Sequence, residues 1–220
     1  EHALASSPAR AWTRLELATS AAIWIVMMLA MMLPTAAPMV LALGAIGRGQ
    51  RARTSPLAPA ASFVLGYAIV WTAFSIAAAT LQWGAHRLAW LSNAEPATRE
   101  VLSGALLLAA GAFQFSALKD ACLSRCRSPL AFLMARWRPG ALAALRMGIA
   151  HGRDCVGCCW ALMALMFVAG SLHLLWTAAL AMLMLAEKAL RSGRLLGRIA
   201  GGVLMIWGAY RIGAQLFGPA

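Results

Sequence analysis

Long apolar segments constrain this chain most, because each is long enough to cross a lipid bilayer as a helix, which takes about 20 residues. Four such segments cover residues 20–46, 58–83, 98–118 and 194–216. A further apolar stretch, 155–188, is too long for one span and has Gly170 and Ser171 near its middle. We interpret it as a hairpin of two short spans. The chain is therefore predicted to be an all-α, polytopic transmembrane helix bundle with about six spans, a single membrane domain over residues 1–220.

The composition agrees with a membrane location. Hydrophobic residues make up 62% of the chain and charged residues 12%, against about 45–50% and about 25% in soluble domains. The net charge is +12, but no long basic run alternates with aromatic residues as a nucleic-acid surface would need. We expect a lipid bilayer as partner and no nucleic acid.

The basic residues also predict the orientation. They gather in three loops, at 48–53, 119–154 and 188–198. Under the positive-inside rule these loops are cytoplasmic, so both termini, including residues 1–19, are expected outside the cytoplasm. The segment 119–154 mixes arginines with large apolar residues and is interrupted at Pro139-Gly140. It is predicted to form interfacial helices between spans three and four.

Five cysteines within 38 residues form the main candidate site. They fall in two groups whose spacing makes helix neighbours, Cys122 and Cys126 in the first, and Cys155, Cys158 and Cys159 in the second. Met163 and Met166 continue the second group along one helix face, and His151 lies one turn before Cys155. Thiolate and thioether ligands favour Cu(I), whereas a closed zinc site uses only Cys and His. The pattern predicts a soft-metal site, Cu(I) or alternatively zinc; ordinary core packing and a structural disulfide are the other readings.

Two further groups lie at membrane depth. Met28, Met31 and Met32 precede Pro34 in the first span and could hold or relay Cu(I) at a kinked helix. Ordinary packing of flexible methionines against neighbouring helices is the alternative interpretation. Polar candidates are Glu187, Lys119, Lys188 and His173. The two lysines are expected to extend toward the interface from span ends, His173 to be solvated at the outer turn, and Glu187 to be the functional candidate.

Taken together, the motifs LKDACLSRCRSP, HGRDCVGCCWALM, AMMLP and AEK resemble an uncharacterised bacterial family of predicted metal-binding integral membrane proteins, often labelled copper chaperones. The resemblance covers most of residues 20–190 and implies a small polytopic inner-membrane protein with a soft-metal site. The matching motif residues are Met28, Met31, Met32, Pro34, Lys119, Cys122, Cys126, Pro129, Cys155, Gly157, Cys158, Cys159, Trp160, Glu187 and Lys188. The chain departs from the family pattern at Leu172-His173 and Trp176-Thr177.

Three functions follow as hypotheses. The first is a Cu(I)-binding membrane protein that handles copper or delivers it to a copper enzyme. The second is a membrane thiol-disulfide oxidoreductase that passes electrons to a quinone through two cysteine pairs. The third is a non-catalytic accessory subunit of a larger membrane complex. No hydrolase, nucleotide-binding or haem-attachment motif is present in the sequence, so we name no catalytic residue.

Overall fold

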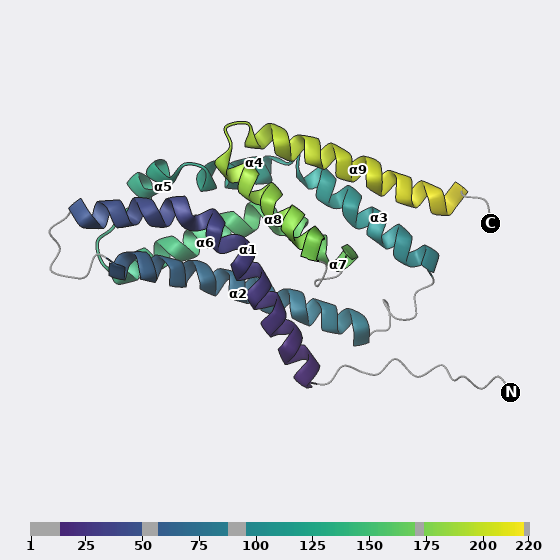
Figure 1. Ribbon diagram of the computed structural model, residues 1–220, viewed down its shortest axis with the longest axis horizontal. Coiled ribbons are helices and arrows are strands. Elements are labelled where there is room, and N and C mark those ends of the chain that lie inside the picture. Colours follow the sequence, from purple (N-terminus) through teal and green to yellow (C-terminus); the bar gives the residue numbers. More distant parts are fainter. Residues whose placement is uncertain (1–13, 50–56, 88–95, 170–173, 218–220) are drawn as a thin grey trace.

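The computed structural model describes residues 14–49, 57–87, 96–169 and 174–217, and every regular element in these ranges is a helix. In chain order the helices are α1 (Arg14–Gly49), α2 (Leu57–Arg87), α3 (Pro96–Phe113), α4 (Ala117–Cys126), α5 (Pro129–Arg136), α6 (Ala141–Ala164), α7 (Met166–Ala169), α8 (Leu174–Ala189) and α9 (Gly193–Phe217) (Figure 1). The predicted all-α fold is confirmed.

The count of membrane spans is lower than expected. Among the described residues, α1, α2 and α9 are long and apolar enough to cross a bilayer. The pair α3 and α4 adds a fourth candidate if the two helices are taken as one span bent by 63°. The structure therefore offers three spans, or four with the bent pair, and corrects the prediction of six.

The missing spans both belong to the stretch 155–188, which was expected to be a hairpin of two crossings. Helix α6 is unbroken from Ala141 to Ala164 and carries Arg146, Arg153 and Asp154, which lower its hydropathy. Helix α8 has 16 residues, which is about 24 Å of helix against a hydrocarbon core of about 30 Å. Neither helix is a full span by length and composition, although α8 contacts both α6 and the single turn α7.

The third expected span, 98–118, ends early at a bend that matters for the site. Helix α3 stops at Phe113, and Ser116 starts α4 as its N-cap, accepting a hydrogen bond from the Lys119 amide at 3.1 Å. Because the chain turns here, α4 packs against α6 instead of continuing along α3. The turn carries Lys119, Cys122 and Cys126 into the interior.

Close packing of α2 on α6 places the other half of the site. The two helices run side by side (Figure 1). A Cβ atom on Gly66 would collide with the Leu145 carbonyl oxygen, and one on Gly148 with the Phe63 carbonyl oxygen. Only glycine lets the two backbones approach this closely, and the approach brings Tyr67 of α2 against α6.

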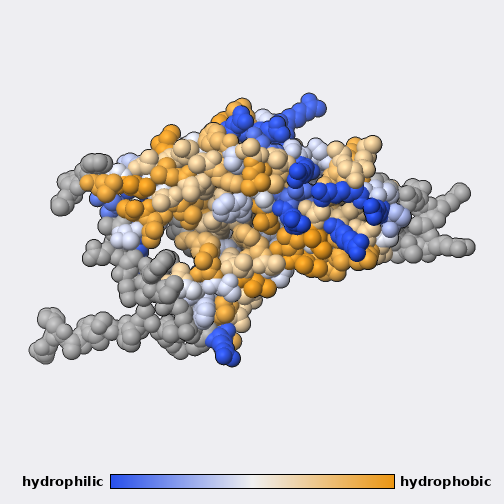
Figure 2. All heavy atoms as spheres, turned by 180° about the vertical axis from the view of Figure 1, so that it is seen from behind, coloured by the Kyte–Doolittle hydropathy of each residue, from blue (hydrophilic) through white to orange (hydrophobic). Residues whose placement is uncertain are grey.

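The surface is largely apolar. Side chains that point outward from α1 and α9 include Val26, Leu41, Ile206 and Tyr210, each more than two-thirds exposed. Figure 2 shows apolar residues over much of the visible face, with hydrophilic side chains confined to limited areas. An exposed apolar area of this extent is typical of a protein that contacts lipid or another protein.

Candidate metal centre

One buried core cluster contains most of the sulfur-bearing residues predicted from the sequence. Its cysteines and methionines are Cys122, Cys155, Cys158, Cys159, Met28, Met31, Met32, Met163, Met166 and Met184, with Cys126 and Met27 packed against it from partly buried positions. These sulfur-bearing residues come from α1, α4, α6 and α8, together with the first residue of α7, while α2, α3 and α9 supply other members of the cluster. All five cysteines are free thiols. Residues far apart in the sequence thus form one sulfur-rich interior.

Cys155 lies at the centre of the polar contacts in this cluster. Its sulfur accepts a hydrogen bond from the Lys188 ammonium at 2.9 Å and lies 3.1 Å from the Tyr67 hydroxyl oxygen. The side chain is fully buried. An ammonium group that donates to a buried sulfur stabilises negative charge on it, and the thiolate is the form of cysteine that binds metals.

Helix α1 supports this arrangement through backbone and hydroxyl groups near its prolines. The Lys188 ammonium also donates to Thr35 Oγ1 at 3.1 Å. Tyr67 donates its hydroxyl to the Met32 carbonyl oxygen at 3.0 Å, and Thr35 donates to the same oxygen at 2.8 Å. Tyr67 and Lys188 are therefore both held in place on the two sides of Cys155.

Three further thiols lie near Cys155. Cys158 and Cys159 follow it on α6, and Cys126 of α4 packs against the buried cluster that contains all three. We call Cys126, Cys155, Cys158 and Cys159 the thiol quartet. The quartet joins both cysteine groups of the sequence, since Cys126 comes from α4 and the others from α6.

The four thiols are not arranged as a metal-binding site in this structure. The Cys158 and Cys159 thiols donate to the Cys155 carbonyl oxygen at 3.1 and 2.8 Å. Among the described residues, no three His, Cys, Asp or Glu side chains form a group with the geometry to hold a metal ion. A metal bound here would require Cys158 and Cys159 to turn away from this carbonyl. The donor set itself, four thiols beside thioethers, has the chemistry that Cu(I) prefers.

Cys122 sits beside the quartet. An ideal Cβ atom on Gly157 would lie 2.7 Å from the Cys122 sulfur, so the glycine of CVGCCW provides the space for this thiol. Nearby, Arg125 of α4 forms an ion pair with Asp154 of α6 at 3.1 Å. The Arg125 side chain is 56% exposed, which places this edge of the cluster next to the surface.

His151 lies one turn before Cys155 and is 3% exposed. Its ring packs among those of Phe63, Tyr67 and Phe132, with centroid distances of 5.5–5.8 Å. Burial lowers the pKa of the imidazole below its usual 6.5, so the ring is neutral at pH 7. Within the described part of the chain, its Nδ1 atom has no hydrogen-bond partner. A neutral, unpartnered nitrogen is suited to ligate a metal after a small movement.

The methionines predicted in the first span and after CVGCCW line the same interior. Met28, Met32, Met163 and Met166 are fully buried, and Met31 is 7% exposed. They belong to the cluster that holds Cys155. The structure therefore brings the two methionine groups together with the thiols, in packing contact and without a defined coordination geometry.

The polar candidates form a second buried site beside the first. The Lys119 ammonium donates to both carboxylate oxygens of Glu187 at 2.8 Å, and to the Gln114 side-chain oxygen. Lys119 and Glu187 are each 2% exposed. The expectation that the two lysines extend toward the interface is wrong, because Lys119 is buried in this ion pair and Lys188 reaches Cys155. The expectation for His173 falls outside the described residues.

Two residues of the site, Tyr67 and Thr35, were not predicted from the sequence. Tyr67 lies 88 positions before Cys155, and Thr35 lies 153 positions before Lys188. The sequence indicates them only weakly: Tyr67 is a polar aromatic residue inside an apolar span, and Thr35 is a hydroxyl residue between Pro34 and Pro38.

A family model described as "PpoB2: Copper chaperone" matches residues 21–211, which include every residue of the site. No curated protein matches the chain. No solved structure matches it either.

Proposed function

The chain belongs to the PpoB2 copper chaperone family, and from this premise we propose that it is an integral membrane protein that carries copper as Cu(I) on its thiol quartet. The observation that carries the proposal is that four free thiols from two helices belong to one buried cluster or pack against it, Cys126 of α4 and Cys155, Cys158 and Cys159 of α6. Buried thioethers lie in the same cluster. Soft sulfur ligands in a buried apolar setting select Cu(I) over harder ions.

Lys188 has a defined role in this proposal. Cu(I) bound by two thiolates carries one negative charge, and a buried negative charge needs a partner. The Lys188 ammonium already donates to Cys155 at 2.9 Å and would balance that charge. Tyr67 and Thr35 keep the ammonium and the sulfur aligned while Cys158 and Cys159 turn toward the ion.

We further propose that the protein lies in a bacterial inner membrane with its basic loops in the cytoplasm. The four candidate crossings, α1, α2, the bent pair α3 and α4, and α9, are an even number and would leave both termini outside the cytoplasm. The hairpin of α6, α7 and α8 would then enter the bilayer and return to the same side. This arrangement would place the partly exposed Cys126 toward the cytoplasmic face.

The cargo would be passed to a copper enzyme or another membrane partner, in a binding role that needs no catalytic residue. Cys126 is the one quartet member that is partly exposed. It would therefore be the first thiol to bind a copper ion that enters the site and the last to release one that leaves. Transfer between thiolates requires each sulfur to come within reach of the next, so Cys158 and Cys159 would first have to turn away from the Cys155 carbonyl oxygen.

The direct test is copper content. The full chain, purified in detergent under reducing conditions and loaded with Cu(I), should retain copper, and Cys155→Ser should abolish most of the retention because it removes the central ligand. Cys122→Ser is the matched control, since it removes another buried thiol that lies beside the quartet, and should retain most of the copper.

Two results would contradict the proposal. One is stoichiometric copper on Cys155→Ser, and the other is equal loss in both variants. Thermal unfolding of each variant should be recorded on the same samples, so that loss of copper from a folded protein is separated from loss of the fold.

A further inference from the structure

We propose that a cavity between α5 and α6 binds the phosphate of an anionic membrane lipid. The cavity has a volume of about 500 Å³ and lies at the end of α5 and the beginning of α6. Its lining includes Arg136, Arg138 and Arg146 and contains no acidic residue. The inference rests on the proposed membrane location and not on copper binding.

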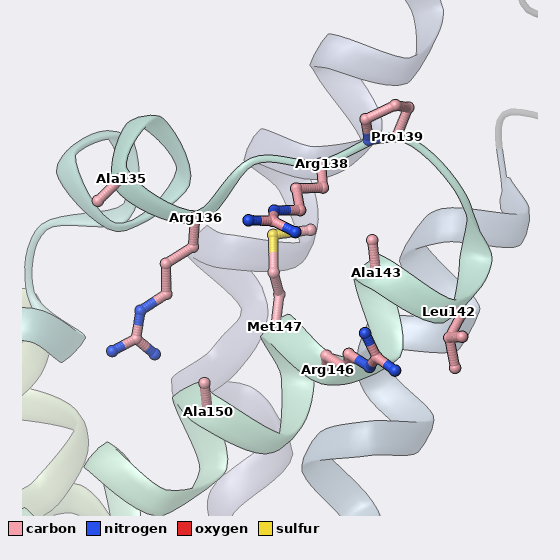
Figure 3. A pocket seen from close by; sticks show the side chains of 9 residues that line it. All are labelled: Ala135, Arg136, Arg138, Pro139, Leu142, Ala143, Arg146, Met147 and Ala150. Carbon is pink, nitrogen blue, oxygen red and sulfur yellow. The ribbon is translucent and has the colours of Figure 1, made fainter.

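The three arginines surround the cavity from different elements. Arg136 comes from the last turn of α5, Arg138 from the link to α6, and Arg146 from the second turn of α6. Figure 3 shows their side chains arranged around the space, with Met147 between them. Arg136 is held in position by the Phe132 ring, whose centroid is 4.9 Å from the guanidinium carbon.

The positive charge of this cavity is uncompensated in the described part of the chain. None of the three guanidinium groups has an ion pair or hydrogen bond there. Four acidic residues are engaged elsewhere: Glu187 with Lys119, Asp154 with Arg125, Asp120 with Arg198, and Glu100 with Arg211. Three guanidinium groups without a carboxylate are suited to a multivalent oxyanion, for which arginine supplies paired donors.

The start of α6 adds backbone donors to the same space. The N-cap residue Gly140 has φ 106°, which favours glycine, and contributes no side-chain cap. The first amide groups of α6 therefore lack an acceptor from a capping side chain, and Pro139, Leu142 and Ala143 place this terminus on the cavity wall. A helix N-terminus attracts anions through its free N–H groups and its dipole. Together with the arginines it makes a site for phosphate.

Exposed apolar side chains on α5 and α6, the helices that form the cavity, favour a lipid as the source of that phosphate. Leu130, Met134 and Leu142 are 69%, 85% and 61% exposed, and Leu142 also lines the cavity. Arginines and exposed large apolar residues on short helices are typical of the boundary between headgroups and acyl chains. A phosphate in the cavity would leave the acyl chains against these side chains, and basic pockets at this depth bind anionic headgroups.

The test measures lipid bound to the full chain purified in detergent, by native mass spectrometry during titration with phosphatidylglycerol or phosphatidylcholine. Wild-type protein should bind phosphatidylglycerol and prefer it to phosphatidylcholine. Arg138→Gln/Arg146→Gln should bind it about 25-fold more weakly, because each basic residue near an anionic headgroup contributes about a factor of five. Arg191→Gln/Arg194→Gln removes the same charge from exposed residues outside the cavity and should match wild type.

Three outcomes would overturn the proposal: equal weakening in both double variants, equal binding of the two lipids, or displacement of phosphatidylglycerol by millimolar inorganic phosphate, which would assign the site to a free anion. Arg138→Lys/Arg146→Lys keeps the charge and should bind between wild type and the glutamine variant, even if the latter folds poorly. Copper content is measured on the same samples. Loss of copper from wild type with retained lipid binding would refute the copper proposal alone, whereas weak lipid binding with full copper content would refute only this one.

Discussion

The buried ion pair between Lys119 and Glu187 gives the sharpest prediction about stability. Both side chains are 2% exposed, and the ammonium contacts both carboxylate oxygens at 2.8 Å. Lys119→Met would leave the carboxylate buried without a cation. Breaking a buried pair by removing one partner costs about 3–5 kcal/mol. Glu187→Met leaves the ammonium with only Gln114 as acceptor and should cost a similar amount.

The double variant Lys119→Met/Glu187→Met should recover most of this loss. It removes both charges, so the remaining cost is the Gln114 amide, which loses its contact with Lys119 and is worth about 1–3 kcal/mol as a buried unpaired group. The two single variants together would predict about 6–10 kcal/mol. The pair should therefore show strong non-additivity, as residues in direct contact do.

The assay is thermal unfolding in detergent, followed by tryptophan fluorescence from the nine tryptophans. For a chain of about this size, 1 kcal/mol shifts the unfolding temperature by about 2–4 °C. Each single variant should unfold about 6–20 °C below wild type, and the double variant should unfold above both. Single variants within 1 °C of wild type, or a double variant that unfolds below both, would refute the reasoning.

Three further predictions test the packing and the site. Gly148→Ala should lower the unfolding temperature by several degrees, because its Cβ would collide with the Phe63 carbonyl, while Gly202→Ala, with open space around it, should stay within about 1 °C. Iodoacetamide followed by mass spectrometry should modify Cys126 before the other four cysteines, which are buried; equal rates would contradict the described burial. Arg125→Gln should cost about 1–3 kcal/mol by thermal unfolding, more than the loss of a fully exposed pair, since Arg125 is 56% exposed but the Asp154 side chain is only 10% exposed.

The sequence predicts which residues form helices better than it predicts which helices cross the membrane. Continuous apolar segments produced α1, α2 and α9 close to the expected residues, because a 20-residue apolar run has few other stable forms in lipid. The bend at residues 114–116 depends on a cap formed by Ser116 and on a buried Gln114. Such local polar contacts do not alter hydropathy, so the third span was expected to continue to residue 118.

The candidate site was likewise predicted only in part: spacing within one helix could be read from the sequence, but contacts between helices could not. Helical spacing groups Cys122 with Cys126, and Cys155 with Cys159, because residues four apart share a helix face. It does not reveal that Lys188 points at Cys155 or that Lys119 pairs with Glu187. These contacts join residues 33 and 68 positions apart, and they are set by how α4 and α8 pack on the rest of the bundle. The lysines were therefore expected to reach the interface, as isolated lysines near span ends do.

The two buried sites are connected through α8, and this gives the ion pair a positioning role. Glu187 and Lys188 are adjacent, so their side chains point about 100° apart around the helix. The Lys119 ammonium holds Glu187 and the Lys188 ammonium donates to the Cys155 sulfur, and we infer that the ion pair fixes the rotation of α8 that directs Lys188 at Cys155. A buried charge pair contributes little net stability compared with apolar residues of similar size, so its value lies in this alignment. The variant Lys119→Met/Glu187→Met should then bind Cu(I) more weakly than wild type even though its stability largely returns. Copper affinity equal to wild type in that variant would show that packing alone orients α8.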